Sequence, residues 1–167
     1  MSKATTKSNP QPSGPQNATL ALDDLIGYNL RRAHYVQRAR FASVFAPYRI
    51  RPMQLLILGL LSQNKLMKQG ELCKELGVKP TNIVTLIDEL EDRKLIVRRY
   101  TRTDKRSRAL QLTPAGKRFT AELLPLHESL EQSVSHYLSK AERAELLRLL
   151  KKFRAASVEP ELDYDDP

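Results

Sequence analysis

Basic side chains crowd one short stretch of the chain, residues 93–108, which holds eight lysines and arginines against a single acid, Asp104. A solvated surface usually mixes charges of both signs, because like charges placed this closely repel each other. The density therefore predicts a polyanionic partner, with nucleic acid as the first candidate and an anionic membrane as the second. The basic residues are Arg93, Lys94, Arg98, Arg99, Arg102, Lys105, Arg106 and Arg108.

A β-hairpin is predicted to carry most of these charges. Leu95–Tyr100 and Arg108–Leu112 are β-prone runs joined by the polar residues 101–107. The tip of a hairpin can place an arginine in the minor groove of DNA, where narrow A·T-rich walls concentrate negative potential. Asp104 lies two residues before Arg106, close enough to pair with its guanidinium and orient it. The further DNA contacts predicted for the hairpin are Arg102, Lys105 and Arg108.

Two short helices are predicted just before the hairpin, the first over residues 68–76 and the second beginning at Pro80, with a tight turn at Gly77–Lys79 between them. The second helix places its apolar residues on one face, at Ile83, Leu86, Ile87 and Leu90. Its opposite face carries Thr81, Asn82, Thr85, Asp88 and Glu89.

This pair of helices is typical of a helix-turn-helix whose second helix enters the major groove, where short outer side chains allow a close approach. An ordinary helical hairpin with a solvated polar face fits the segment equally well, and the basic hairpin that follows decides for DNA binding. The DNA contacts predicted for this segment are Lys79, Pro80, Thr81, Asn82 and Thr85.

Helices are predicted for the rest of the folded region. They span about residues 20–45, then 52–61, then 114–137 with a kink at Pro125, and a last helix begins at a capping box formed by Ser139 and Glu142. The fold class is therefore mainly α: a winged helix-turn-helix lobe with a two-stranded β-hairpin wing, and N- and C-terminal dimerisation helices. The last helix has an apolar stripe of Leu146, Leu149, Leu150 and Phe153.

The two ends of the chain differ in composition from the part between them. Residues 1–19 are almost without apolar side chains and predict a disordered arm, and residues 157–167 hold five acids and no base, which predicts an acidic tail. The intervening residues 20–156 form one predicted domain with a net charge of +12. Within it, 51–113 is the predicted winged helix-turn-helix, and 20–50 and 114–156 are the predicted dimerisation helices.

The cysteine and the histidines do not indicate a catalytic or metal site. Cys73 is the one cysteine of the chain, and its place beside Leu72 and Leu76 favours a small core residue over an oxidation sensor. The three histidines lie too far apart for metal ligands, and no catalytic motif is recognisable. We expect no enzymatic activity, cofactor or metal. Without a stretch of roughly 18 apolar residues or a signal peptide, the sequence predicts a cytoplasmic protein.

The predicted helices and hairpin match a known pattern over four runs of residues: Leu76–Glu91, Leu95–Arg98, Asp104–Ser107 and Leu112–Gly116. These runs resemble the MarR family of winged helix-turn-helix regulators. The resemblance implies that residues 80–93 form the recognition helix and that Asp104, Lys105 and Arg106 form the wing tip, with Arg106 in the minor groove. It also implies repression as the mode of regulation.

One position departs from the family pattern. Lys94 stands where the family usually has a glycine that closes the recognition helix. A left-handed lysine would cost on the order of 1 kcal/mol, so we expect the helix to end differently here.

The long first helix and the last two helices carry apolar stripes that a small winged lobe could not cover by itself. Packing against a second copy would bury them and would set two recognition helices about one DNA turn apart, which predicts a homodimer on a roughly palindromic site. A monomer with internally packed helices is the alternative.

Proteins of the family that this chain resembles bind a small-molecule effector where the dimerisation helices meet the DNA-binding lobe. The first helix is rich in arginine and tyrosine, which suits an aromatic or phosphate-bearing anion. The resemblance extends to regulators of aromatic-acid catabolism, including a branch that senses hydroxycinnamoyl-coenzyme A thioesters such as p-coumaroyl-CoA. The alternatives are arginines that are merely solvated or approach the DNA backbone, and a constitutive or architectural DNA-binding protein without an effector. The predicted effector-binding residues are Tyr28, Arg31, His34, Tyr35 and Arg38.

Overall fold

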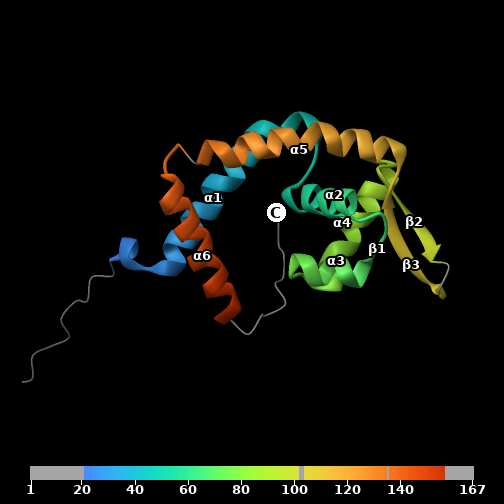
Figure 1. Cartoon of the computed structure of the whole chain (residues 1–167), viewed down its shortest axis with the longest axis horizontal. Coiled ribbons are helices and arrows are strands. Elements are labelled where there is room, and N and C mark those ends of the chain that lie inside the picture. Colours follow the sequence, from blue (N-terminus) through green and yellow to red (C-terminus); the bar gives the residue numbers. More distant parts are fainter. Residues whose placement is uncertain (1–20, 102–103, 135, 157–167) are drawn as a thin grey trace, which may run out of the picture. The chain divides into compact units, whose positions relative to one another are not determined.

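The computed structural model describes residues 21–101, 104–134 and 136–156, with the side chains of 101, 104–107, 134 and 156 left out. It is mainly helical, with one small antiparallel sheet (Figure 1). The helices are α1 (Ile26–Phe45), α2 (Pro52–Gln63), α3 (Gln69–Leu76), α4 (Pro80–Asp92), α5 (Pro114–Val134) and α6 (Lys140–Ala156). The strands are β1 (Met67–Lys68), β2 (Ile96–Thr101) and β3 (Asp104–Leu112). The chain divides into two compact units within α1, between Arg38 and Ala39.

The first helix begins later than its apolar pattern predicts. Leu22–Asp24 form a short 3₁₀ turn, Leu25 is extended with φ −88° and ψ 120°, and α1 starts only at Ile26. The side-chain amide of Asn29 donates to the backbone oxygen of Asp23 over 2.7 Å. This bond satisfies a carbonyl at the end of the 3₁₀ turn, because the last carbonyls of a helix have no intrahelical partner.

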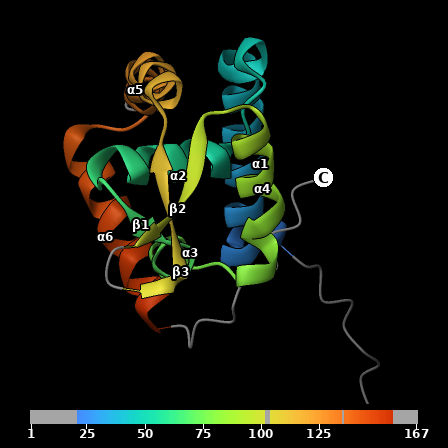
Figure 2. The same ribbon diagram turned by 90° about the vertical axis from the view of Figure 1, so that its right-hand side faces the viewer.

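The hydrophobic core of the second unit is built around α2, which is apolar on nearly all sides. Ile57 and Leu58 of α2 are fully buried, together with Ile87 of α4, Leu110 of β3 and Leu123 of α5. Both views show α2 running beneath α5 (Figures 1 and 2). Burial of each such side chain contributes about 1.5–3 kcal/mol, so α2 anchors both the helix-turn-helix and α5.

The sheet has the strand order β1-β3-β2, with both pairings antiparallel. The predicted hairpin is confirmed, but its strands reach to Thr101 and back from Asp104, so the loop expected over 101–107 is much shorter. Cross-strand pairing continues into the polar segment, where Thr101 lies opposite Asp104 after a register shift between Tyr100 and Thr101. Strand β1, which pairs Met67 with Leu110, was not predicted from the sequence because two residues are too few to show a period.

The recognition-helix candidate α4 ends on a left-handed lysine. Lys94 has φ 57°, so the expectation of a different helix end was wrong. Its backbone N–H donates to the oxygen of Glu91 over 2.7 Å, and that of Leu95 donates to Leu90 over 2.9 Å. These bonds form a Schellman motif, and the buried pair Leu90 and Leu95 supplies its apolar contact. The hydrogen bonds and that contact offset the strain of the left-handed backbone.

Replacing Lys94 by glycine is expected to raise the free energy of unfolding by about 1 kcal/mol, because glycine adopts a left-handed backbone without a Cβ penalty. Urea denaturation followed by circular dichroism measures the change. The matched control is Lys74→Gly, which places glycine in the right-handed helix α3 and is expected to destabilise by a similar amount. A Lys94→Gly protein no more stable than the parent would contradict this reading of the strain.

The start of α5 is fastened to the same turn. The Thr113 hydroxyl donates to the backbone oxygen of Lys94 over 2.7 Å and accepts from the backbone N–H of Gly116 over 2.9 Å, which confirms Thr113 as the predicted N-cap. The Thr113 N–H donates to the oxygen of Leu95 over 3.0 Å. Gly116 lies so close to this segment that a Cβ on it would be 1.8 Å from the Leu95 oxygen.

The predicted capping box at the start of α6 is confirmed. The Ser139 N–H donates to the Glu142 carboxylate over 2.7 Å, and the Glu142 N–H donates to the Ser139 hydroxyl over 3.3 Å. Hydrogen bonds from the side chain and backbone of Ser139 lower the pKa of Glu142. Pro125 lies inside helix α5, where the predicted kink stays a prediction, and the helix ends at Val134, three residues short of its predicted end.

Candidate nucleic-acid interface

A tight turn sets α4 against α3. Gly77 ends α3 with φ 66°, a left-handed backbone that glycine adopts readily, and the Val78 N–H donates to the oxygen of Cys73 over 3.0 Å. Lys79 is extended, and Pro80 occupies the first position of α4, where its missing N–H costs nothing. The two helices therefore form the helix-turn-helix that the sequence predicts.

Helix α4 presents a polar outer face, as its periodicity predicts. Thr81 and Thr85 are exposed and Asn82 is half-buried, while the four predicted apolar residues of the inner face are buried. The Thr81 hydroxyl donates to the side-chain oxygen of Asn82 over 3.1 Å. Val84 also lies on the surface, with 38% of its area exposed, and is absent from the predicted contacts because the outer face was predicted from its polar residues. A branched methyl group on this face suits contact with a thymine methyl.

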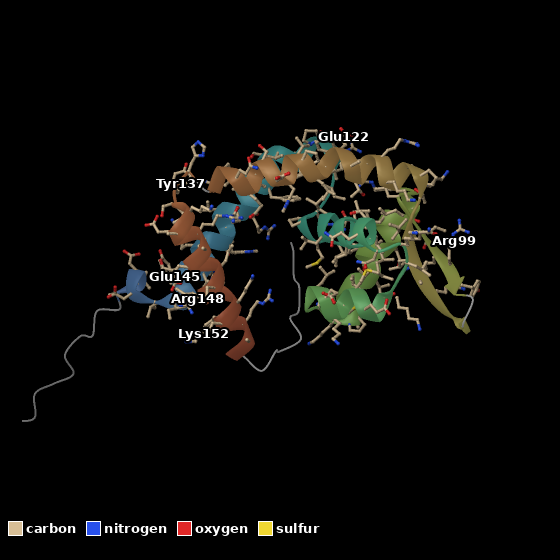
Figure 3. All side chains as sticks on the ribbon, viewed as in Figure 1. Arg99, Glu122, Tyr137, Glu145, Arg148 and Lys152 are labelled. Carbon is tan, nitrogen blue, oxygen red and sulfur yellow. The ribbon has the colours of Figure 1, made fainter. Side chains whose placement is uncertain are left out.

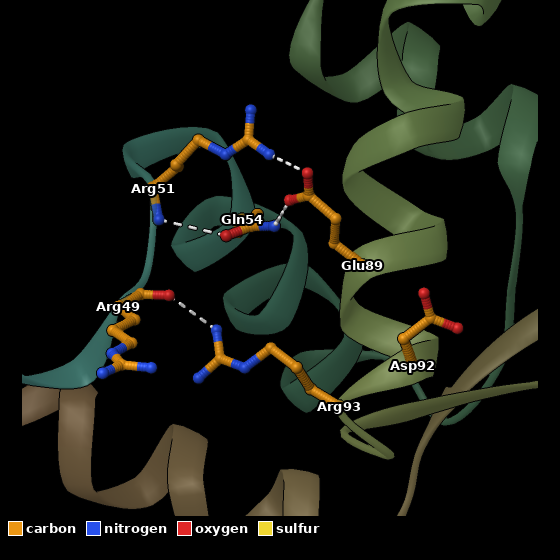
Figure 4. A pocket seen from close by; sticks show the side chains of 6 residues that line it. All are labelled: Arg49, Arg51, Gln54, Glu89, Asp92 and Arg93. Carbon is orange, nitrogen blue, oxygen red and sulfur yellow. Dashed lines mark hydrogen bonds and ion pairs between the residues drawn. The ribbon is translucent and has the colours of Figure 1, made fainter.

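Glu89 lies at the edge of the predicted outer face and is bound by residues at the start of α2. Its carboxylate is paired with the Arg51 guanidinium and accepts from the side-chain amide of Gln54 over 2.7 Å (Figure 4). Gln54 is only 2% exposed and also accepts from the Arg51 N–H over 3.1 Å. This network ties α4 to the start of α2 and leaves an open depression of about 320 Å³, into which Asp92 also faces.

Two of the eight basic residues are bound by partners within the lobe. Arg93 donates to the backbone oxygens of Arg49, over 2.7 Å, and Tyr48, over 3.0 Å, and its guanidinium lies 5.2 Å from the centre of the Phe119 ring. Arg98 pairs with Asp88 and Glu91. The eight basic residues of 93–108 therefore overstate the charge available to a polyanion, because a sequence does not show which cations are already paired.

Arg98 joins the wing to the recognition-helix candidate. It extends from β2, and its two terminal nitrogens donate separately to Asp88 and Glu91, one turn apart on α4. The Arg98 backbone N–H donates to Glu91 as well, over 3.2 Å. Burial lowers the pKa of the guanidinium, but the hydrogen bonds and charges of the two carboxylates outweigh burial and raise it.

The wing leaves basic groups on the surface. Arg108 lies opposite Tyr100, donates to its hydroxyl over 3.2 Å and stacks on its ring at 5.3 Å. Arg99 extends into solvent from β2 (Figure 3). Arg102 lies outside the described residues, as do the side chains of Asp104, Lys105 and Arg106, whose backbone begins β3. The predicted pairing of Asp104 with Arg106 therefore stays a prediction.

Comparison with known proteins places this lobe in a family. A model described as the MarR family matches residues 50–107. The putative transcriptional regulatory protein for the hcr operon of Thauera aromatica is 31% identical over 128 residues, which cover 76% of this chain and 77% of that protein. This chain belongs to the MarR family. Its relatives are transcriptional regulators, so it is a DNA-binding transcriptional regulator and not an enzyme.

Solved MarR-type structures share the fold. The repressor CouR bound to a 23-mer DNA duplex superposes with a TM-score of 0.74 at 33% identity, covering 79% of this chain and 94% of CouR. CouR bound to p-coumaroyl-CoA gives 0.76 at 29% identity, covering 85% and 100%. Bordetella bronchiseptica BpsR, whose DNA binding is regulated by 6-hydroxynicotinic acid, gives 0.77 at 26% identity, covering 86% and 100%. The winged fold predicted for a MarR protein is thereby confirmed.

The predicted effector residues of this MarR protein lie on α1, in the first compact unit. Arg31 and Tyr35 lie together: the guanidinium donates to the Tyr35 hydroxyl over 3.1 Å and lies 5.6 Å from its ring centre. The Tyr28 and Arg38 side chains are half-buried, and His34 and Tyr35 are exposed. The i, i+4 spacing thus produced the expected arginine and tyrosine pair on one face.

Cys73 is buried, in agreement with the core position predicted for it. Burial raises the pKa of its thiol, which disfavours the reactive thiolate. Within residues 21–101, 104–134 and 136–156, no group of three His, Cys, Asp or Glu side chains could hold a metal ion. None of the helices in the described part of the chain is long and apolar enough to cross a membrane.

Proposed function

We propose that this MarR protein is a homodimeric repressor that binds a roughly palindromic operator in the cytoplasm and is released by an aromatic acid or an aromatic acyl-CoA. The observation that supports the DNA-binding part most strongly is the exposed polar face of α4 beside a basic wing in the same lobe. In this proposal Thr81, Asn82 and Thr85 reach base edges or phosphates, with Val84 against a thymine methyl. Lys79 and Pro80 hold the helix start at the groove.

The wing tip is proposed to enter the minor groove through Arg106. Replacing Arg106 by alanine is expected to weaken operator binding about 10- to 100-fold, because an arginine in a narrow minor groove is strongly attracted and reads its shape. Fluorescence anisotropy with an operator obtained by in vitro selection measures the loss. Lys105→Ala serves as the comparison, since a phosphate contact weakens binding on all sequences and flattens the salt slope by about one unit. Equal affinity of Arg106→Ala and the parent would reject the wing assignment.

Homodimer formation is supported by the exposed apolar stripe of α6. Leu146, Leu149 and Phe153 are each 44–53% exposed, and Leu147 and Leu150 are 41% and 36% exposed. Such a contiguous apolar face is rarely left in water and marks an interaction surface. A second copy of the chain would cover it with an identical stripe, as a two-fold interface requires.

The double variant Leu146→Gln with Leu150→Gln is expected to shift the protein to monomers in sedimentation velocity. Operator affinity is expected to fall at least 100-fold. In a dimer the first bound recognition helix holds the second at a high effective concentration near its half-site, and separate monomers lose this advantage. The matched control is Lys151→Gln with Lys152→Gln, which changes exposed side chains of the same helix. A dimer of unchanged stability in the leucine variant would refute this interface.

Release by an effector is supported by the relatives and by α1. CouR binds p-coumaroyl-CoA, and BpsR responds to 6-hydroxynicotinic acid. Tyr28, Arg31, His34, Tyr35 and Arg38 provide the aromatic and cationic groups that such anions need. Calorimetric titration with p-coumaroyl-CoA, coenzyme A and p-coumaric acid tests the proposal. Operator binding that none of these ligands relieves would favour a constitutive DNA-binding protein instead.

A further inference from the structure

Tyr100 is an exposed aromatic residue on the wing strand β2 that has no role in the proposed function. Its side chain is 63% exposed and lies opposite Arg108 of β3. The Arg108 guanidinium donates to the Tyr100 hydroxyl over 3.2 Å and lies 5.3 Å from the ring centre. Unlike Arg98, Arg108 has no carboxylate partner within the described part of the chain. The charge of this pair is therefore available to a molecule outside the lobe.

The pair lies on the face of the hairpin that is turned toward α4. Side chains two residues apart on a strand point to the same face, so Tyr100 shares its face with Arg98, whose guanidinium is bonded to α4. Leu110 lies opposite Arg98 on that face and is buried. The same face is therefore buried at Leu110, joined to α4 at Arg98 and exposed at Tyr100, about 7 Å further along the strand.

This position suits contact with the DNA backbone between two grooves. When α4 occupies the major groove and the wing tip occupies the adjacent minor groove, one sugar–phosphate backbone lies between the two elements. The surface of the wing nearest α4 must then run past that backbone. Tyr100 and Arg108 are on this surface, and Arg106, the proposed minor-groove residue, lies two residues before Arg108 in the sequence.

The pair offers two kinds of hydrogen-bond donor to one phosphate. The Tyr100 hydroxyl accepts from Arg108, so its own hydrogen stays free to donate, and an accepted bond from a cation polarises the hydroxyl into a better donor. A guanidinium has five N–H groups, and the bond to Tyr100 uses one of them. The contact with the ring also restricts the orientation of the guanidinium before DNA binds. Phosphate oxygens accept hydrogen bonds from both tyrosine and arginine in protein–DNA complexes.

We propose that Tyr100 is a DNA-contacting residue of this regulator and that Tyr100 and Arg108 together bind one backbone phosphate between the two grooves. The contact positions the wing and carries no base readout, so it strengthens binding equally on every sequence. This inference rests on the proposed docking of α4 and the wing tip. A cross-strand pair that only stabilises the hairpin is the competing explanation, since an aromatic ring and a cation opposite each other strengthen a sheet.

The test removes the Tyr100 hydroxyl alone. Tyr100→Phe keeps the ring opposite Arg108, and with it the cross-strand contact. It is expected to weaken DNA binding at least tenfold at an unchanged salt slope, because a neutral hydroxyl releases no counterion. Fluorescence anisotropy of the full chain measures this on a selected operator and on a random duplex of the same length, and the same loss is expected on both.

Arg108→Gln tests whether the two side chains act as a pair. It is expected to weaken binding at least tenfold and to flatten the salt slope by about one unit for each subunit bound. In the Arg108→Gln background Tyr100→Phe is expected to cost less than threefold, because the hydroxyl has lost the cation that polarises and positions it. Tyr137→Phe is the matched control, since Tyr137 is 74% exposed, also contacts an arginine and lies in the turn before α6. Its affinity and salt slope should equal those of the parent.

Three outcomes overturn the proposal: unchanged affinity of Tyr100→Phe on both duplexes, a loss confined to the selected operator, or a full tenfold loss that persists in the Arg108→Gln background. The second would show a base contact, and the third would show a hydroxyl that acts without Arg108. A parent that prefers no operator over the random duplex would refute the sequence-specific repressor, and the random duplex then decides the phosphate contact. A parent that prefers its operator, with Tyr100→Phe equal to it, would refute this contact alone.

Discussion

Replacing Gly116 by alanine is expected to lower the free energy of unfolding by about 3 kcal/mol, the upper end of the usual cost of overpacking. The added Cβ would lie 1.8 Å from the backbone oxygen of Leu95 and 2.8 Å from its carbonyl carbon. Neither atom can withdraw as a flexible side chain would. The Leu95 oxygen also accepts from the Thr113 N–H, so relief of the clash breaks the bond that starts α5. Urea denaturation measures the loss.

Gly70 provides the matched control for this substitution. It lies in α3 with no atom within 4 Å of its virtual Cβ, so Gly70→Ala is expected to stabilise the protein by up to about 1 kcal/mol through helix propensity. Changes of opposite sign in the free energy of unfolding at the two glycines would distinguish the clash from any general effect of alanine. A Gly116→Ala protein as stable as the parent would show that the turn at Leu95 can move.

Replacing Arg98 by glutamine is expected to weaken operator binding about 10- to 100-fold without changing its salt dependence. The side chain holds the wing strand to α4 through Asp88 and Glu91, so its loss frees the angle between the two DNA-contacting elements. It also leaves two unpaired carboxylates on the helix proposed to face phosphates, and removal of one partner of a partly buried pair is destabilising. Anisotropy titrations at several salt concentrations measure affinity and slope together.

Neutralising the carboxylates tests this explanation of the Arg98 effect. We expect part of the operator affinity to return when Asp88→Asn and Glu91→Gln are added to Arg98→Gln. The repulsion between the two carboxylates and the DNA phosphates then disappears, although the link between the wing strand and α4 does not return. Arg99→Gln, one residue along the same strand and exposed, is the control and should leave stability unchanged. A salt slope flattened by about one unit in Arg98→Gln would instead identify a phosphate contact.

Local signals in the sequence predicted much of this fold. The helices and their ends follow from periodicity, from Gly77 and Thr113, and from the pair Ser139 and Glu142, because each of these depends only on neighbours along the chain. The two faces of α4 were predicted for the same reason. Glu89 was the exception, since it lies where the two faces meet and a distant partner, Arg51, decides its side.

What the sequence could not show depends on contacts between distant segments. Strand β1 exists because Met67 meets Leu110, a pairing that leaves no periodic trace in two residues. The basic residues look alike in the sequence, yet Arg93 and Arg98 are bound by partners of the same lobe that only the fold brings near. Lys94 kept its left-handed backbone because the Schellman bonds and the buried pair Leu90 and Leu95 outweigh a strain of about 1 kcal/mol.

The close packing of Gly116 on Leu95 joins the wing to the start of α5 at one point of the backbone. The turn that ends α4, the root of β2 and the first turn of α5 share the same two carbonyl groups, those of Lys94 and Leu95. We therefore expect a displacement along α5 to tilt the strand pair as a whole. Such a tilt would move the far end of the strands, toward Arg106, more than the junction itself.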